Sequence, residues 1–346
     1  MFPIDSIKWF YVDAIVSYDT IALMEWELTD LTFSAECIQK IAEVEQLIGK
    51  VEGLLLSRPT PKLRRKNRAR TVRGSTGIEG NSCTVEQVEA IASGEPVALS
   101  KKEQLEIRNA LEAYDALPEF DPFKIASLLD AHSKLMGNGL ELAPGRFRQG
   151  PVEVYVTETR TRSMPRWETI EPTMQHLFDY LRTSEELMLI KSIRFHFEFV
   201  NIHPFFDGNG RTARLWQTRL LMVDHPVFEF LDVESMVFEH RADYYKQICS
   251  AQECGDVNGF VLFMLEQIRC SLCNLWEKSA TVPNTYADRM AAAKQTLKTR
   301  SFSRKDYLHL FKTISQATAS RDLSIGVSTG LLVREGDKRT AVYRFL

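Results

Sequence analysis

The sequence of 346 residues lacks the features that mark several large protein classes. Its six cysteines are too few for a disulfide scaffold, and this predicts a reducing compartment. No apolar run reaches about 18 residues, so no segment is expected to span a membrane. The first 18 residues carry acids at Asp5 and Asp13 and no cationic region before an apolar core, unlike a secretory signal peptide. These absences predict a cytoplasmic protein.

Signals for metal centres and repeats are also sparse. Cys270 and Cys273 have the spacing of a metal or redox pair, and Cys249 and Cys254 lie upstream. The pair falls inside a long apolar-periodic segment, GFVLFMLEQIRCSLCNLW, so cysteines buried in a helix are favoured over a zinc site. There are no internal repeats and no low-complexity tract. With 44% hydrophobic and 26% charged residues, the chain has an ordinary globular composition.

Charge is unevenly distributed along the chain. The net charge is −3, but residues 295–346 contain ten Lys/Arg and four Asp/Glu, a balance of +6 that leaves −9 on the rest. A basic C-terminal piece on an acidic body indicates a separate unit with its own partner.

Helical periodicity dominates most of the chain. Residues 34–56 place Ile38, Ile41, Val44 or Glu45, Ile48, Val51 and Leu55 on one stripe, with Ser34 as a cap. Residues 57–61 (SRPTP) break this helix, and a basic helix follows whose charges suit a solvated face. A short helix capped at Thr84 comes next. Further helices are predicted over residues 100–117, 121–137, 169–183, 185–202 and 212–222.

One segment departs from the helical pattern. In GRFRQGPVEVYVTETRTRSMPRW, residues 145–167, the valines Val152, Val154 and Val156 alternate with Glu153 and Tyr155, which is the period of a strand. An isolated hairpin in a helical protein is more often a lid or flap than a sheet core.

The densest cluster of chemistry is HPFFDGNGRTAR, His203 to Arg214. Gly208 and Gly210 permit backbone conformations that form an anion nest, and the helix beginning near Arg211 adds its positive end. Arg211 and Arg214 share one helix face and could clamp phosphates. Asp207 could hold a divalent cation, and His203 could remove a proton near neutral pH. Together these residues indicate nucleotidyl or phosphoryl transfer.

Each part also has a simpler interpretation. Asp-Gly-Asn-Gly is an excellent turn, His203-Pro204 could merely end a helix, and the arginines could form surface pairs. The complete stretch, however, matches HPFxDGNGRxxR. Without Asp207, eight of its positions are fixed, and they match by chance about once in ten billion windows. The sequence therefore resembles the Fic (filamentation induced by cAMP) family. GRFRQGPVEVYV is similar to the family's flap, YYKQICSAQECGD to its YY…AN.GD segment, and STGIEGN to its inhibitory motif.

The resemblance implies an all-α core with a β-hairpin flap and the transfer of AMP from ATP to a protein hydroxyl. By position, His203 is the base, Asp207 holds Mg²⁺, and Arg211 and Arg214 bind the β/γ-phosphate region. The flap aligns the target protein by strand addition. Gly210 stands where the phosphotransferring Doc relatives have lysine, and Gln252 where many members have asparagine. The residues expected to bind ATP are Glu79, Val152, Glu153, Val154, Tyr155, Asp207, Gly208, Asn209, Gly210, Arg211, Thr212, Ala213, Arg214, Tyr244, Tyr245 and Gln252.

Glu79 has a specific expected role. A carboxylate beside the phosphate site would pair with Arg214, remove the cation that orients the γ-phosphate and repel the triphosphate. The alternative is a glutamate at a helix end in a surface ion pair. In some relatives of this kind the same glutamate positions water to hydrolyse the AMP–protein bond, so removal of AMP is a second activity to consider.

The C-terminal residues predict a helix, a turn, a second helix and a hairpin, similar to the winged helix-turn-helix appended to many bacterial Fic proteins. Ser303 suits a helix cap with Asp306 at the third position. Arg321, Lys338 and Arg339 are candidates for DNA phosphate contacts. A protein-contact or dimerisation wing is the alternative.

The expected organisation is an N-terminal helical region (1–60), a Fic core (61–280) with its inhibitory helix near 75–81, a linker (281–295) and the winged unit (296–346). The favoured function is an autoinhibited protein adenylyltransferase that uses ATP and Mg²⁺. It would act on a target protein at the flap or on itself, as a homodimer. The alternatives are a protein de-adenylylase that uses Glu79, and a DNA-binding regulator whose core senses nucleotide.

Overall fold

Helices make up most of the chain, and the strands form only two small antiparallel sheets. The prediction of an all-α fold with a β-hairpin is confirmed. The computed structural model of the protein describes residues 28–29, 32–54, 61–140, 143–157, 160–280, 285–311, 314–337 and 340–346. The chain divides into two units, Met1–Leu275 and Trp276–Leu346.

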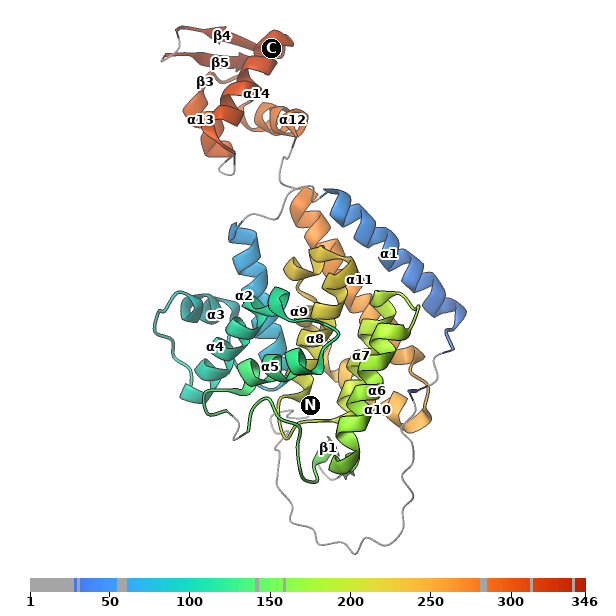
Figure 1. The fold of residues 1–346 in the computed structure, drawn as a ribbon. Helices are drawn as coiled ribbons and strands as arrows, with labels where there is room; N and C mark the ends of the chain where they lie inside the picture. The colour runs from blue at the N-terminus through green and yellow to red at the C-terminus, as the bar shows by residue number, and fades with distance from the viewer. Residues whose placement is uncertain are drawn as a thin grey trace, which may run out of the picture. The chain divides into compact units, whose positions relative to one another are not determined.

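The first unit contains helices α1 to α10 and most of α11 (Figure 1). Its α-helices are α1 (Ala35–Leu54), α2 (Pro61–Ile78), α3 (Val85–Ala92), α4 (Lys101–Asp115), α5 (Ile125–Met136), α6 (Ile170–Thr183), α7 (Met188–Ile202), α8 (Asn209–Asp224), α9 (Val233–Glu239), α10 (Arg241–Cys254) and α11 (Asn258–Ala280). The remaining elements are the 3-10 turns η1 (Leu117–Glu119), η2 (Trp167–Thr169) and η3 (Pro226–Phe230) and the strands β1 (Glu153–Thr157) and β2 (Arg160–Ser163).

The helix starts follow from local side-chain chemistry. The Thr84 hydroxyl oxygen accepts a hydrogen bond from the backbone N–H of Gln87, and the side-chain oxygen of Gln87 accepts one from the backbone N–H of Thr84. Ser100 and Glu103 form the same pair of hydrogen bonds at the start of α4. Each capping box satisfies two backbone N–H groups that would otherwise lack a partner. The cap predicted at Thr84 is therefore confirmed.

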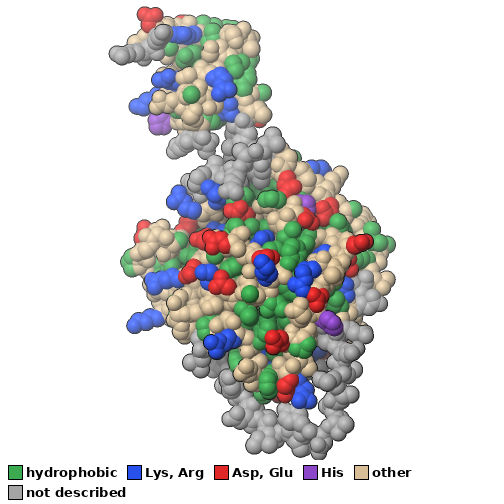
Figure 2. All heavy atoms as spheres, in the orientation of Figure 1, with side chains coloured by type: hydrophobic (Ala, Val, Ile, Leu, Met, Phe, Trp, Pro, Cys, Tyr) green, Lys and Arg blue, Asp and Glu red, His purple; other side chains and the backbone are tan. Residues whose placement is uncertain are grey.

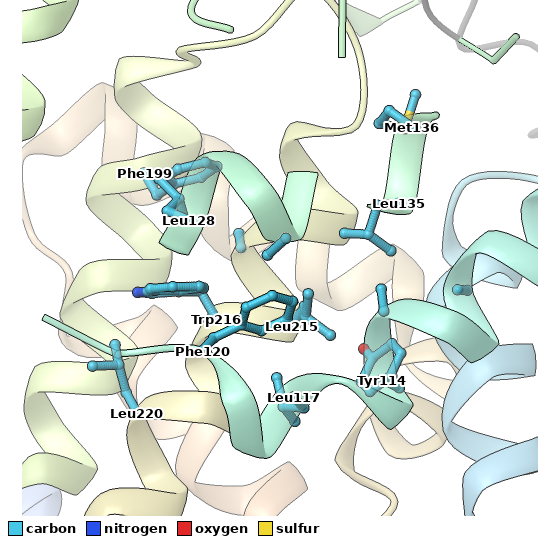
Figure 3. Packing of buried hydrophobic residues seen from close by; sticks show 14 of the residues in the cluster. Tyr114, Leu117, Phe120, Leu128, Leu135, Met136, Phe199, Leu215, Trp216 and Leu220 are labelled. Atoms are coloured by element: carbon cyan, nitrogen blue, oxygen red, sulfur yellow. The ribbon is translucent and has the colours of Figure 1, made fainter. Parts of the chain in front are cut away.

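Helix α8 runs through the centre of the first unit, and its apolar side chains organise one of the two cores. Trp216 is fully buried, and its ring lies 6.2 Å from the rings of both Phe120 and Phe178. Leu117 and Leu215 lie beside them, as Figure 3 shows. Helices α4 to α7 supply most of the other members of this core. The central position of α8 fixes the residues at its N-terminal end.

Helix α1 packs in a second core with α7 and α11 through most of the predicted stripe, with Ile38 as the exception. Cys37, Val44, Ile48 and Val51 are fully buried, whereas Ile38 is 58% exposed. Cys37 is buried instead of Ile38 because it lies four and seven residues before Ile41 and Val44, on the same helix face, and its thiol donates to Asn258 at the start of α11. Leu55 and residues 1–27, 30–31 and 56–60 of the predicted N-terminal region lie outside the described residues.

Helix α2 lies against α9 almost backbone to backbone. A Cβ atom added to Gly74 would come within 2.6 Å of the backbone nitrogen of Ser235. The Ser235 hydroxyl donates to the carbonyl of Arg70 at 3.0 Å, and Asn67 donates to the carbonyl of Phe230 at 2.8 Å. These contacts fix the C-terminal half of α2, which leads directly to Glu79.

The second unit has its own core and a three-stranded antiparallel sheet in the order β3-β5-β4. Its elements are α12 (Tyr286–Leu297), β3 (Phe302–Ser303), α13 (Arg304–Leu310), α14 (Gln316–Ser328), β4 (Leu332–Glu335) and β5 (Val342–Phe345). Ser303 caps α13 with Asp306, as predicted. Among the described residues, the two helices α13 and α14 are followed by the antiparallel strands β4 and β5, in the expected order.

Helix α12 occupies most of the stretch that was expected to be a linker. Residues 281–284 lie outside the described residues, but Thr285 and Asp288 form a capping box that starts the helix. Met290 is buried in the core of the second unit, and Arg289 forms an ion pair with Asp322 of α14 at 2.6 Å. Because Met290 is buried and Arg289 is paired with Asp322, α12 is part of the folded second unit and not a linker.

Of the three residues predicted to contact DNA, one lies on the described surface of the second unit. Arg321 lies exposed on α14, whereas Lys338 and Arg339 lie outside the described residues. On the face of this unit that Figure 2 shows, most of the charged side chains are Lys or Arg. Among the described residues, no helix is both long enough and apolar enough to cross a membrane.

Candidate active site

The loop between α7 and α8 carries the predicted catalytic residues. His203 ends α7 in the left-handed backbone conformation, with φ 52° and ψ 59°, which costs a residue with a Cβ atom about 1–2 kcal/mol. Gly208, with φ 78°, starts α8, and a Cβ atom there would come within 2.6 Å of the Met136 side chain. Position 208 therefore requires glycine for two reasons, its backbone conformation and its close packing against Met136.

Side chains within the loop and beneath it fix its shape. Asn209 accepts a hydrogen bond from the backbone N–H of Phe205 at 2.9 Å and donates to its carbonyl at 2.8 Å. The Phe205 ring stacks on His132 of α5, with 3.5 Å between the ring centroids. Nδ1 of His132 accepts from the N–H of Gly145, so Nε2 carries the proton that is donated to the carbonyl of Asp207 at 3.0 Å. The amide of Asn209 is thus committed to the loop, and only its backbone N–H can take part in an anion nest.

The two predicted arginines are buried cations at the start of α8. Arg211 is 7% exposed and pairs with Asp207 at 3.1 Å, and Glu106 lies 3.9 Å away. Arg214 is 3% exposed and donates to the carbonyl of Ser75 at 3.0 Å. Charged side chains are almost never buried without compensation, and carboxylates supply part of it here, Asp207 for Arg211 and Glu79 for Arg214.

Several buried donors in this region have no hydrogen-bond partner among the described residues. They are Nε of Arg211, the hydroxyl of Thr212, and Nε and Nη1 of Arg214. A buried unpaired donor costs about 1–3 kcal/mol, so such a group calls for an explanation. A bound polyanion would satisfy the guanidinium groups, and the N-terminus of α8 favours the same kind of ligand.

Glu79 lies at the N-terminal end of α8, against Gly210 and Arg214. It lies in the turn after α2, and its carboxylate accepts a hydrogen bond from Nη2 of Arg214 at 2.6 Å. A Cβ atom on Gly210 would collide with the Glu79 carboxylate, so the carboxylate rests directly on the backbone of the glycine loop. Although burial disfavours a charged Arg214, Glu79 raises the pKa of the guanidinium above its usual value. The structure thus brings Glu79 into contact with Gly210 and Arg214, which are close to each other on α8 but far from Glu79 in the sequence.

His203 is electrically neutral in this setting. Its side chain is buried, and burial together with the nearby Arg148 cation lowers its pKa to about 4. Nδ1 lies 3.4 Å from the carbonyl of Val200, and a donated proton there leaves Nε2 as the basic nitrogen. The imidazole can therefore accept a proton at neutral pH.

Arg148, just before the flap, was not singled out from the sequence. It is 1% exposed, and Nε donates to the carbonyl of His203 at 2.8 Å. Its other nitrogens donate to the carbonyls of Gly150 at 2.7 Å and Pro165 at 2.5 Å. Burial lowers the pKa of this guanidinium to about 10. No spacing rule identifies such a residue, because all its partners are backbone carbonyls.

The flap is the antiparallel hairpin β1–β2, in which Glu153 pairs with Ser163 and Val154 with Arg162. Arg162 donates to Oε1 of Gln252 at 2.9 Å, and Nε2 of Gln252 donates to Oδ1 of Asn201 at 2.5 Å. The Gln252 side chain therefore links the flap to the end of α7. The side chain of Tyr155 lies outside the described residues.

Tyr244 and Tyr245, which are both expected to bind ATP, differ in exposure. Tyr244 is 1% exposed, and its hydroxyl donates to Nε2 of His196 at 2.8 Å, since Nδ1 of His196 donates to Gln217. A side chain this buried has almost no accessible surface for contact with a ligand. Tyr245 is partly exposed and donates to the carbonyl of Ile78, next to Glu79, at 3.3 Å.

Comparison with solved structures decides the family. A Fic family protein from Desulfovibrio desulfuricans is 31% identical to this chain, with a TM-score of 0.69 over 93% of this chain and 98% of the other. The chain belongs to the Fic family. A family profile described as Fic/DOC matches residues 122–221, which include the loop from His203 to Arg214. Fic-1 from C. elegans, at 22% identity and a TM-score of 0.57 over 70% of this chain and 75% of the other, shares the fold.

Curated relatives of this Fic protein carry an activity in their names. The protein adenylyltransferase Fic of Nematostella vectensis is 30% identical over 202 residues, or 55% of this chain and 44% of that protein. The protein adenylyltransferase fic-1 of Caenorhabditis elegans is 28% identical over 211 residues, or 57% of this chain and 39% of the relative. This Fic protein thus spans less than half the length of these relatives.

Proposed function

We propose that the protein is an adenylyltransferase that moves AMP from ATP to a Ser, Thr or Tyr hydroxyl of a target protein. The observation that carries the proposal is the set of buried, unpaired guanidinium donors of Arg211 and Arg214 beside a neutral His203. The names of the curated relatives, protein adenylyltransferase, support the same reaction.

The proposed triphosphate site is the N-terminal end of α8. The backbone N–H groups of residues 208–210 and the helix dipole favour phosphate oxygens, and the two arginines supply permanent charge. Thr212 and Ala213 would lie beneath it, and Tyr245 with residues 152–155 would bound the nucleotide. Gln252 would reach it only by leaving Arg162 or Asn201.

His203 would act as the general base. In the proposed step, its Nε2 takes the proton of the target hydroxyl as the hydroxyl oxygen bonds to the α-phosphorus of ATP. The bond from that phosphorus to the oxygen that bridges to the β-phosphorus breaks, and pyrophosphate leaves. The negative triphosphate would offset the effect of the Arg148 cation, so that the pKa of His203 rises toward the range in which a base is efficient.

Asp207 fits the role of a Mg²⁺ ligand. Its Oδ1 accepts from the N–H of Gly208 at 2.6 Å and from Arg211 at 3.1 Å, and no hydrogen bond to Oδ2 is formed by the residues that the structure describes. The described residues contain no cluster of three or more metal-binding side chains. Mg²⁺ normally needs only one or two carboxylates when phosphate oxygens and water complete its shell. When bound, the ion would neutralise charge on the phosphates.

Glu79 would inhibit the enzyme by occupying the nucleotide's place. Its carboxylate neutralises Arg214 and lies on the Gly210 backbone, where phosphate oxygens would have to sit. Nucleotide and Glu79 would then exclude each other by both volume and charge. The same position suits a carboxylate that orients water, so removal of AMP from a modified protein is tested beside transfer.

The partners belong to the proposal as well. The edge of β1 not paired with β2 would align an extended segment of the target protein, or of this chain itself, by main-chain hydrogen bonds. We further propose a cytoplasmic homodimer. Exposed Arg321 on α14 supports DNA binding by the second unit, and Arg321→Ala should then weaken retention of DNA in an electrophoretic mobility assay.

The deciding experiment uses α-labelled ATP with the full chain. Glu79→Gly should incorporate AMP into itself or into protein from a cell extract, and Glu79→Gly/His203→Ala should not. A chain that binds ATP but never labels protein would be a nucleotide sensor. A wild-type chain that releases AMP from a pre-labelled protein, with Glu79→Gly unable to do so, would be a de-adenylylase.

A further inference from the structure

Arg148 joins three backbone segments that are separate in the chain. Its guanidinium donates to the carbonyls of His203, Gly150 and Pro165 at 2.8, 2.7 and 2.5 Å. Its backbone N–H also donates to the carbonyl of Pro204 at 2.8 Å. Every nitrogen of this side chain therefore holds a main-chain oxygen.

Two of these oxygens lie at the base of the flap. Gly150 comes shortly before β1, which begins at Glu153, and Pro165 comes shortly after β2, which ends at Ser163. One planar guanidinium thus fixes both ends of the hairpin. The two ends of the hairpin are also bonded to each other, because the N–H of Met164 donates to the carbonyl of Val152 at 3.0 Å.

The third oxygen belongs to a residue in a strained conformation. His203 has a positive φ, and the helical bond from its N–H to the carbonyl of Phe199 fixes only one side of its peptide unit. Such a conformation persists only where the surroundings hold it. Nε of Arg148 holds the carbonyl of His203, and the N–H of Arg148 holds the next carbonyl, that of Pro204.

The charge of Arg148 is maintained at a cost. No carboxylate among the described residues forms an ion pair with Arg148, and burial lowers the pKa of the guanidinium. A buried apolar side chain would fill the same volume without that cost. The planar fork offers what an apolar side chain cannot, which is simultaneous hydrogen bonds in fixed directions.

We propose that Arg148 is a positioning residue that sets the flap and the imidazole of His203 in one fixed relation. The inference rests on the proposed function, in which the flap places the target hydroxyl and His203 accepts its proton. Through Arg148, the surface that aligns the target and the base that activates it share one anchor. A displacement of about 1 Å between such groups can lower the rate about 100-fold.

Arg148→Met and Arg148→Lys test the inference in the Glu79→Gly background. Methionine keeps the volume and removes the donors, so kcat for AMP transfer should fall about 100-fold while KM for ATP changes less than about twofold. Lysine can still donate to at least one carbonyl and should recover about tenfold of this loss. The stoichiometry of ATP binding, measured by calorimetry, reports the folded fraction and should not change.

Leu181→Ala in the same background is the matched control. Leu181 is 1% exposed in α6 and belongs to neither the flap nor the loop between α7 and α8, so its truncation destabilises the unit without removing the anchor. An equal loss of kcat in Leu181→Ala and Arg148→Met, or a change confined to the KM for ATP, would overturn the inference.

Hydrogen exchange provides a readout that needs no activity. Arg148→Met should speed exchange at the amides of residues 148 and 164 together, by about tenfold or more, as expected when charged hydrogen bonds are lost. Leu181→Ala should speed exchange at amides of α6 but leave the exchange rates of the amides of residues 148 and 164 unchanged. Faster exchange at only one of them would refute the coupling. If Glu79→Gly with Arg148 intact transfers no AMP, the proposed function fails, and the exchange result still decides the coupling.

Discussion

Removal of the Glu79 carboxylate should increase AMP transfer by the full-length chain. Glu79 and Arg214 are joined at 2.6 Å, and their side chains are 20% and 3% exposed, so water screens the pair weakly. A hydrogen bond to a charged group contributes about 1.5–3 kcal/mol. Glu79 and the nucleotide compete for Arg214, and a coupling free energy of about 1–3 kcal/mol between two such groups corresponds to a 5- to 150-fold change in the rate of AMP transfer. Glu79→Gly, which removes both charge and volume, should fall in that range.

Two further variants separate charge from volume. Glu79→Gln keeps the side chain over Gly210 but loses the charge, so it should activate less than Glu79→Gly. Glu106→Gln removes a carboxylate from the other arginine, at the longer distance of 3.9 Å, and should change the rate little. Equal activation by Glu106→Gln would mean that general charge in the site, rather than the pair with Arg214, sets the rate.

The assay is incorporation of α-labelled AMP at a single Mg²⁺ concentration, with initial rates for each form. The double variant Glu79→Gly/Arg214→Ala should stay inactive, because the cation that Glu79 releases no longer exists. If Glu79→Gly is no faster than the wild type, the reasoning from this ion pair is refuted. If it loses AMP release instead, the proposed direction of the reaction is reversed.

Four other outcomes are expected. His203→Ala should lower transfer about 10²–10⁴-fold in the Glu79→Gly form while ATP binding, measured by calorimetry, stays unchanged. Asp207→Ala should weaken nucleotide binding in Mg²⁺ but not in EDTA. His132 has a folded pKa of about 4 because burial disfavours its charge, against 6.5 unfolded, so the unfolded chain binds the extra proton between these values. As pH falls from 6.5 to 4, the wild type should therefore lose about 1.4 kcal/mol of unfolding free energy per unit relative to His132→Gln, as urea titrations can measure. Arg289→Met should destabilise the second unit by about 3–5 kcal/mol in calorimetry, because Asp322 would remain buried without its cation.

The sequence predicted those parts of the site whose chemistry is local. The run from His203 to Arg214 places a base, an acid, glycines and two cations on one turn and the first turns of one helix, and the structure keeps them together. Glu79 was found because its motif has a fixed spacing. Its contact with Gly210 was not foreseen, since it depends on how α2 packs on α9.

The parts that were missed depend on tertiary contacts or on a weaker signal. Arg148 and His132 act on backbone carbonyls and N–H groups, which leave no pattern of partner side chains in a sequence. The burial of Tyr244 follows from its bond to His196 across two helices. Helix α12 did have a signal, because Thr285 and Asp288 have capping-box spacing, but the alanine-rich stretch after them was interpreted as a linker.

The close packing at Gly74 limits how Glu79 can move. With backbone against backbone, α2 has no room to slide or roll over α9, and the hydroxyl of Ser235 pins it to the carbonyl of Arg70. The carboxylate can leave Arg214 by rotation of its own side chain, without displacement of the helix. Rotamer changes of exposed side chains take picoseconds to nanoseconds, and a rotation of Glu79 has, among the described residues, only its ion pair with Arg214 to break, whereas collective helix motions take microseconds or longer. Binding of a ligand at Arg214 should therefore show no lag phase in rapid-mixing experiments. The observed rate of binding should depend only on the ligand concentration.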